Sequence, residues 1–162
     1  MRFNVQDFTM EGLIEKITAY PAKGEKGKDI ADGRFIKNLG LEGDWHAKGG
    51  QRQISLFLTE RAQEMNPPDF NLAGLCLSRF SGNISISGLA ASSLKPGVLL
   101  SSGDVLLEIT GEGKRCHEEC KLEKPCPLAG LNLFARVIKS GSMRAGERIG
   151  ILDSLEQVYT TL

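Results

Sequence analysis

The 162-residue sequence has no excess charge of either sign, which narrows the partners it can attract. Twenty Lys and Arg residues balance twenty Asp and Glu residues. A balanced chain has no general field that draws nucleic acid to its surface. We therefore expect no nucleic-acid partner, and a bound anion must be held by a local site.

The sequence also lacks a secretory signal and a long apolar run. Its start, MRFNVQDFTMEGLIEKI, has no basic region followed by an apolar stretch. No apolar run is long enough to cross a bilayer, so no membrane partner is expected. We expect a cytoplasmic protein, in which the four cysteines do not pair as structural disulfides because that compartment is reducing.

Internal repeats, low-complexity tracts and linkers are absent as well, so one domain is expected over residues 1–162, with its core at about 12–152. Nineteen glycines divide the chain into short apolar runs, several of which alternate as strands do. The predicted strands are Leu13–Ala19, Gln53–Leu58, Asn83–Ser87, Val105–Thr110, Leu133–Lys139 and Glu147–Leu152. Short helices are expected at Thr59–Met65 and Asn71–Cys76. The prediction is a mainly β fold with a few short helices (α+β), built as a barrel.

The segment GLEGDWHAKGGQRQ, residues 40–53, is the first candidate binding element. Its four glycines permit positive φ or close approach of the backbone to a ligand. If the backbone at Asp44 and His46 is extended, their side chains share a face. Arg52 offers a planar fork of donors suited to phosphate or carboxylate. Lys48, His46 and Arg52 suit an anionic ligand, and the alternative is an ordinary turn with a capping Asp.

The segment SGNISISGL, residues 81–89, is the second candidate. The Asn83 amide could anchor the loop or face the same ligand as Arg52. The alternative is a strand between turn glycines, which this pattern favours.

The third candidate is the cysteine-rich run GEGKRCHEECKLEKPCP, which begins at Gly111. Cys116, Cys120, Cys126 and His117 form a nominal zinc set, but His117 adjoins Cys116 and the C-x₂-C knuckle is absent. A reactive thiol is the other interpretation, because neighbouring Lys and Arg side chains would stabilise a thiolate. Cys76 lies in an apolar context and is interpreted as a small core residue.

Taken in order, these segments resemble the MOSC domain, named after the C-terminal part of molybdenum cofactor sulfurases. The resemblance is carried by GLEGDWH (40–46), RQISL (52–56), GNI (82–84), the cysteine-rich run, LFARV (133–137) and GERI (146–149). It covers about residues 12–152 and is most similar to the small stand-alone bacterial members. It implies a β-barrel fold and binding of the molybdenum cofactor, a phosphorylated molybdopterin, either held or passed on.

The resemblance also implies roles for individual residues. A family cysteine carries sulfur or ligates molybdenum, and by position Cys120 is the first choice for both roles. Cys116 would resolve a persulfide or disulfide at Cys120, and Cys126 is a third thiol. Contacts to the cofactor are expected from the positions of the glycine-rich loop and of GNI: Asp44, His46, Arg52 and Asn83.

The expected function is therefore molybdenum cofactor binding, with sulfur transfer through a cysteine during cofactor maturation. The aminotransferase-like domain that uses pyridoxal phosphate is missing, so sulfur would come from a donor protein such as a cysteine desulfurase. The acceptor would be a molybdoenzyme or a cofactor-biosynthesis protein. Alternatives are a cofactor carrier or chaperone without turnover, a zinc-stabilised β domain that binds a protein, and a molybdenum oxidoreductase.

Overall fold

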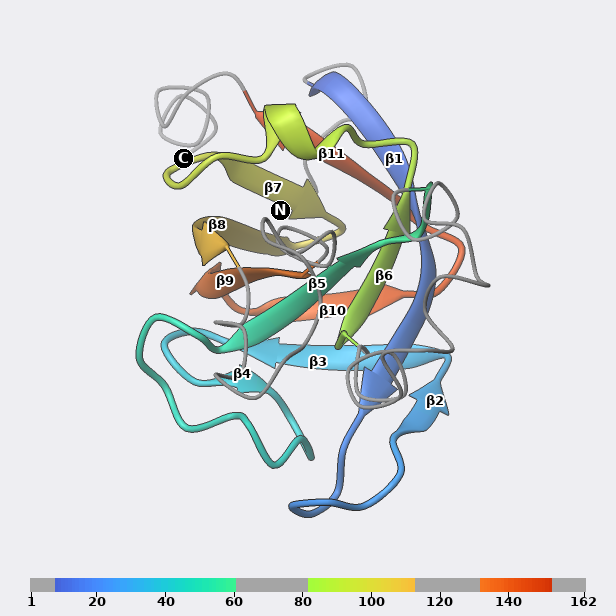
Figure 1. Cartoon of the computed structure of the whole chain (residues 1–162), viewed down its shortest axis with the longest axis vertical. Helices are drawn as coiled ribbons and strands as arrows, with labels where there is room; N and C mark the ends of the chain where they lie inside the picture. The colour runs from blue at the N-terminus through green and yellow to red at the C-terminus, as the bar shows by residue number, and fades with distance from the viewer. Residues whose placement is uncertain (1–7, 61–81, 113–131, 153–162) are drawn as a thin grey trace, which may run out of the picture.

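A closed β-barrel is the main feature of the computed structural model, which describes residues 8–60, 82–112 and 132–152 (Figure 1). Seven strands pair in the order β11-β7-β8-β9-β5-β6-β1, and pairing of β1 with β11 closes the ring. These strands are β1 (Phe8–Ala19), β5 (Ile54–Leu58), β6 (Ile84–Ser87), β7 (Leu99–Ser102), β8 (Val105–Glu112), β9 (Asn132–Lys139) and β11 (Arg148–Leu152). The predicted mainly β fold built on a barrel is confirmed.

Four short strands complete the described β structure. β2 (Lys28–Ile30) pairs with β1 and extends the large sheet beyond the barrel. β10 (Gly141–Arg144), β3 (Asp32–Ile36) and β4 (Gly40–Leu41) form a separate three-stranded sheet. In Figure 1 the β1–β2 hairpin and the loop from β4 to β5 project at the bottom of the view. Both therefore extend from the same end of the molecule.

Helical structure is slight in the described part of the chain. A one-turn 3-10 helix, η3, spans Ala91–Ser93. The predicted helix does begin at Thr59, but its residues after Glu60 lie outside the described ranges, as does the predicted helix at Asn71–Cys76. Among the described residues no helix is long and apolar enough to cross a membrane.

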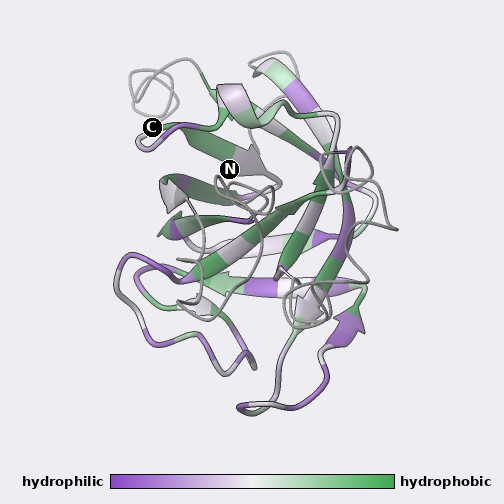
Figure 2. Cartoon of the chain, viewed as in Figure 1, coloured by the Kyte–Doolittle hydropathy of each residue, from purple (hydrophilic) through white to green (hydrophobic). Residues whose placement is uncertain are grey.

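The barrel interior is filled by every second residue of its strands, as the period of two predicts. β5 buries Ile54, Leu56 and Leu58 with at most 1% exposure, and β6 buries Ile84 and Ile86 completely. The facing strands add the buried side chains Ile14, Ile17, Val105, Leu107, Ile109, Leu133, Ala135, Val137, Ile149 and Ile151. Figure 2 shows these strands as bands of hydrophobic residues interrupted by polar ones. The interrupting residues therefore lie on the outside of the barrel.

Four adjacent strands, β9, β5, β6 and β1, carry an unusual set of outward side chains. The registers Ser55↔Phe134 and Phe57↔Asn132 place two polar groups and two rings side by side on β5 and β9. Ser85 of β6 is the register partner of both Phe57 and Lys16. We call this outer surface, made by Lys16, Thr18, Ser55, Phe57, Asn83, Ser85, Asn132 and Phe134, the platform. It positions the candidate site.

Candidate ligand-binding site

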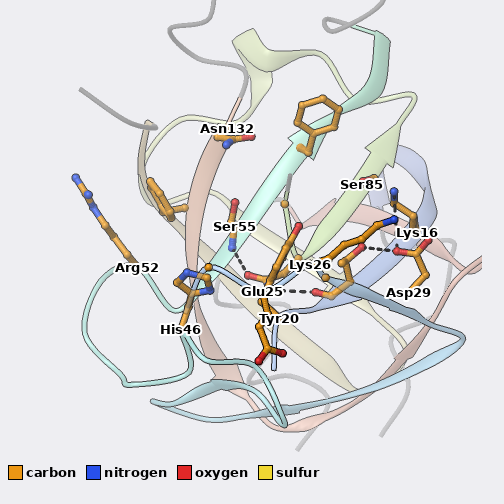
Figure 3. Close-up of a pocket in the computed structure, with 17 residues that line it drawn as sticks. Lys16, Tyr20, Glu25, Lys26, Asp29, His46, Arg52, Ser55, Ser85 and Asn132 are labelled. Carbon is orange, nitrogen blue, oxygen red and sulfur yellow. Dashed lines mark hydrogen bonds and ion pairs between the residues drawn. The ribbon is translucent and has the colours of Figure 1, made fainter. Parts of the chain in front are cut away.

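A cavity of about 1050 Å³ lies over the platform (Figure 3). Besides the platform it is lined by the β1–β2 hairpin, by two residues of the β4–β5 loop and by a glycine two residues before β6. These lining residues are Tyr20, Gly24, Glu25, Lys26, Gly27, Asp29, His46, Arg52 and Gly82. The volume is in the range of pockets that hold cofactors and other small molecules.

Asn83 both lines the cavity and ties three strands together. Its side chain is 2% exposed, and its Oδ1 accepts a hydrogen bond from the Ser55 backbone N–H at 3.0 Å. Its Nδ2 donates to the Thr18 carbonyl at 3.2 Å, while the Thr18 N–H donates to the Asn83 carbonyl at 2.8 Å. Of the two roles considered from sequence, the structure shows the anchoring one directly.

Asp44 and His46 are brought together by a turn and not by an extended backbone. The Asp44 side chain is fully buried and accepts hydrogen bonds from the backbone N–H groups of Tyr20 at 2.8 Å and His46 at 3.0 Å. Its Oδ2 also lies 3.3 Å from His46 Nδ1. His46 lines the cavity, packs edge-on against Tyr20 and is partly open to solvent. Asp44 does not line the cavity itself, but it holds two residues that do, Tyr20 and His46.

Arg52 lies two residues before β5 and reaches the cavity beside an aromatic ring. Its guanidinium carbon is 4.9 Å from the centroid of the Phe134 ring, in the range of a cation–π contact. Lys48, the other cation of the glycine-rich loop, does not line the cavity. Its ammonium lies 3.7 Å from the Trp45 ring centroid. Of the two loop cations, only Arg52 is placed to meet a ligand.

The charges of the cavity differ from one side to the other. Figure 3 shows Arg52 and His46 on one side and Lys16 with Asp29 on the opposite side. Asp29 Oδ1 accepts a hydrogen bond from the Thr18 hydroxyl at 2.9 Å and lies 4.0 Å from the Lys16 ammonium. Cations and carboxylates are mixed there, so the side with Arg52 is the one suited to an anion.

Two buried polar atoms of the lining have no hydrogen-bond partner in the described structure: the Tyr20 hydroxyl oxygen and Asn132 Oδ1. Asn132 is 2% exposed and is the first described residue after the cysteine-rich run in the chain. Most buried polar atoms in proteins are hydrogen-bonded, so exceptions point to a missing partner.

Cys76, Cys116, Cys120 and Cys126 all lie outside the described residues, and so does His117. Within the described ranges, no three or more His, Cys, Asp or Glu side chains are grouped so that they could hold a metal ion.

Sequence reasoning therefore found part of the lining and missed the rest. His46, Arg52 and Asn83 do line one cavity, although Asn83 comes from a different segment from the other two. The aromatic and amide groups of β5 and β9 and the hairpin residues were missed: Phe57, Asn132, Phe134, Tyr20, Lys26 and Lys16. The one available signal was the alternation in β5, which separates Phe57 from the core residues on either side of it.

No family model and no curated protein matches this sequence. Similar solved structures exist. The YuaD protein of Bacillus subtilis is 20% identical, with a TM-score of 0.68 over 88% of this chain and 96% of that one. YiiM of Escherichia coli is 19% identical, with a TM-score of 0.60 over 90% of this chain and 71% of that one.

YiiM of Geobacillus stearothermophilus is 15% identical, with a TM-score of 0.61 over 88% of this chain and 75% of that one. At these identities the likeness establishes the fold alone. The YiiM proteins are MOSC-domain proteins, so the barrel is consistent with a MOSC-type fold.

Proposed function

We propose that this protein binds the molybdenum cofactor in the cavity over the platform. The observation that carries the proposal is the convergence of His46, Arg52 and Asn83 on one cavity. These residues belong to two of the three candidate segments of the sequence, all of which contribute to the MOSC resemblance. Asn132, the first described residue after the third segment, lines the same cavity.

The residues present fit such a cofactor. Arg52 would hold its phosphate through paired donors, as guanidinium groups commonly do. Phe57 and Phe134 would contact the pterin ring. Asn132 Oδ1, which has no partner in the described structure, would accept a hydrogen bond from an N–H group of the pterin. When bound, the cofactor would supply a metal centre with soft sulfur ligands, to which a thiolate is a suitable additional ligand.

The proposal extends to a cysteine of the run that connects β8 and β9. Cys120 is the first choice, with Cys116 as the resolving thiol and Cys126 as a third thiol. A Cys120 thiolate would either ligate molybdenum or accept the terminal sulfur of a donor protein's persulfide, which leaves the donor as a thiolate. Such a transfer protein needs a sulfur donor, for example a cysteine desulfurase, and an acceptor molybdoenzyme or cofactor-biosynthesis protein.

Native mass spectrometry of protein purified without reductant from a host that makes the cofactor tests both parts. We expect a pterin-sized adduct on the wild type that is lost in Arg52→Gln. Arg34→Gln is the matched control, because Arg34 is an exposed arginine of β3 that does not line the cavity. An adduct kept in Arg52→Gln would contradict the assigned site.

The cysteine role is read from the same spectra. A sulfur-sized adduct that is removed by reduction and absent in Cys120→Ala would support sulfur transfer. A pterin adduct with no sulfur-sized adduct would favour a carrier without turnover. A single zinc that is lost with Cys116, Cys120 or Cys126 would favour the zinc-stabilised alternative instead.

A further inference from the structure

Asn132 and Asn83 are buried to the same degree in the same cavity but relate differently to the fold. Both side chains are 2% exposed. The carboxamide oxygen and nitrogen of Asn83 are both used by backbone groups of β5 and β1. Asn132 Oδ1 has no partner in the described structure. The Asn83 side chain therefore stabilises the fold through its hydrogen bonds, whereas the Asn132 carboxamide oxygen makes no such contribution in the described structure.

The surroundings of Asn132 restrict what its partner can be. Its register partner across the ladder is Phe57, and Phe134 is the next outward residue on its own strand. Side chains opposite each other on adjacent strands, and those two apart on one strand, are within contact range for aromatic rings. Asn132 is thus flanked by two aromatic residues, and a planar molecule that carries an amino group would match both the acceptor oxygen and the rings.

The nearest cation places a second restriction on the ligand. Arg52 lies against Phe134, which adjoins Asn132 on the same face of β9. A ligand whose ring contacts Phe134 would lie beside Arg52, which is suited to hold a phosphate group of that ligand. The combination of acceptor, rings and guanidinium is that of a site for a phosphorylated, amino-bearing heteroaromatic compound.

We propose that Asn132 is the specificity-determining residue of the cavity. Its Oδ1 accepts a hydrogen bond from the N–H edge of a planar heteroaromatic ligand that lies against Phe57 and Phe134. This inference rests on the proposed function for the identity of the ligand, which is then the amino-bearing edge of a pterin. A site built around such a bond rejects an analogue that presents a carbonyl oxygen where the ligand has its amino group, because two acceptors then face each other and the buried Oδ1 is left unpaired.

Calorimetric titration with two probes tests this assignment: a pterin bearing a 6-methylene phosphate, and the lumazine counterpart in which a carbonyl oxygen replaces the 2-amino group. We expect the wild type to bind the pterin about tenfold or more tightly than the lumazine. In Asn132→Leu the pterin affinity should fall by about tenfold or more and the preference should vanish.

Thermal unfolding of the ligand-free variants separates this role from a structural one. Asn132→Leu should unfold at the wild-type temperature or above, whereas Asn83→Leu should unfold at a lower temperature. A loss in Asn132→Leu equal to that in Asn83→Leu would overturn the assignment. Unchanged pterin affinity and preference in Asn132→Leu would overturn it too while leaving the proposed function intact. A wild type that binds neither probe would count against both.

Discussion

At the scale of single residues, the hydrogen bonds of the Asn83 side chain predict how much its substitution lowers the free energy of unfolding. Replacing Asn83 with Leu leaves the Ser55 N–H and the Thr18 carbonyl buried without their side-chain partner. Each unsatisfied buried group costs about 1–3 kcal/mol, so the loss of two partners should lower the free energy of unfolding by about 2–6 kcal/mol. Urea denaturation measures this fall. Asn132→Leu is the control, since its carboxamide oxygen bonds nothing in the described structure.

Asp44 is a second residue whose importance is structural before it is chemical. Its buried carboxylate accepts from two backbone N–H groups, and Asn can offer only one acceptor oxygen in the same space. We expect Asp44→Asn to lower the free energy of unfolding by about 1.5–3 kcal/mol, the usual worth of a hydrogen bond to a charged group.

Chemical denaturation of Asp44→Asn and of Glu42→Gln makes the comparison. Glu42 is the exposed acid of the same turn, and its substitution should change stability by less than about 0.5 kcal/mol. Equal effects of the two substitutions would show that the buried contacts of Asp44 contribute nothing.

Single residues also show what part of the site could be predicted. His46 and Arg52 were found because an imidazole and a guanidinium in a glycine-rich loop suit an anionic ligand. Tyr20 and Phe134 were missed because the sequence does not show whether an aromatic side chain points into the barrel interior or toward the cavity outside it. The direction of a strand side chain depends on register, and register is fixed by partners that sequence order does not identify.

At the scale of elements, the pairing of β1 with β6 depends on Gly12, because there is no space for a side chain at that position. A Cβ on Gly12 would lie 2.3 Å from the Ser87 carbonyl oxygen and 2.9 Å from Leu89 Cγ. Relief requires a shift of backbone, so Gly12→Ala should lower the free energy of unfolding by about 1–3 kcal/mol or more. Urea denaturation measures the loss.

Gly111 in β8 is the matched control, because nothing lies within 4 Å of a Cβ built there. Gly111→Ala should be neutral or slightly stabilising, since alanine restricts the unfolded chain. If Gly12→Ala and Gly111→Ala had the same free energy of unfolding, β1 and β6 could not lie as close together at Gly12 as described.

The strands themselves show why some elements could be predicted and others could not. All six predicted strands exist, and β1 differs most at its start, which is Phe8 and not Leu13. The strands that were missed, β2, β3, β4, β7 and β10, have five residues or fewer. Several contain Gly, Asp or Lys, which are poor strand formers by propensity. Such segments become strands because a neighbour supplies the ladder, which local sequence does not reveal.

At the scale of the whole molecule, the balance of charge predicts how ligands arrive. With formal net charge +0, the chain has no long-range field to accelerate an anionic ligand. The association rate constant of a pterin phosphate should therefore change by less than about threefold between 50 and 300 mM salt, a range in which surface fields are strongly screened. Stopped-flow fluorescence measures this rate. A much steeper dependence would show that local cations such as Arg52 act well beyond the cavity.

Closure of the barrel by β1 and β11 also places the two ends of the described chain together. Phe8 and Leu152 are register partners, although almost the whole barrel sequence separates them. A chain whose ends meet can be inserted into a surface loop of another protein without forcing that loop apart. It can equally accept a linker between its ends and new ends elsewhere. The architecture is thus suited to being carried as a module within larger proteins, or to being circularly permuted, with the cavity of the platform unchanged.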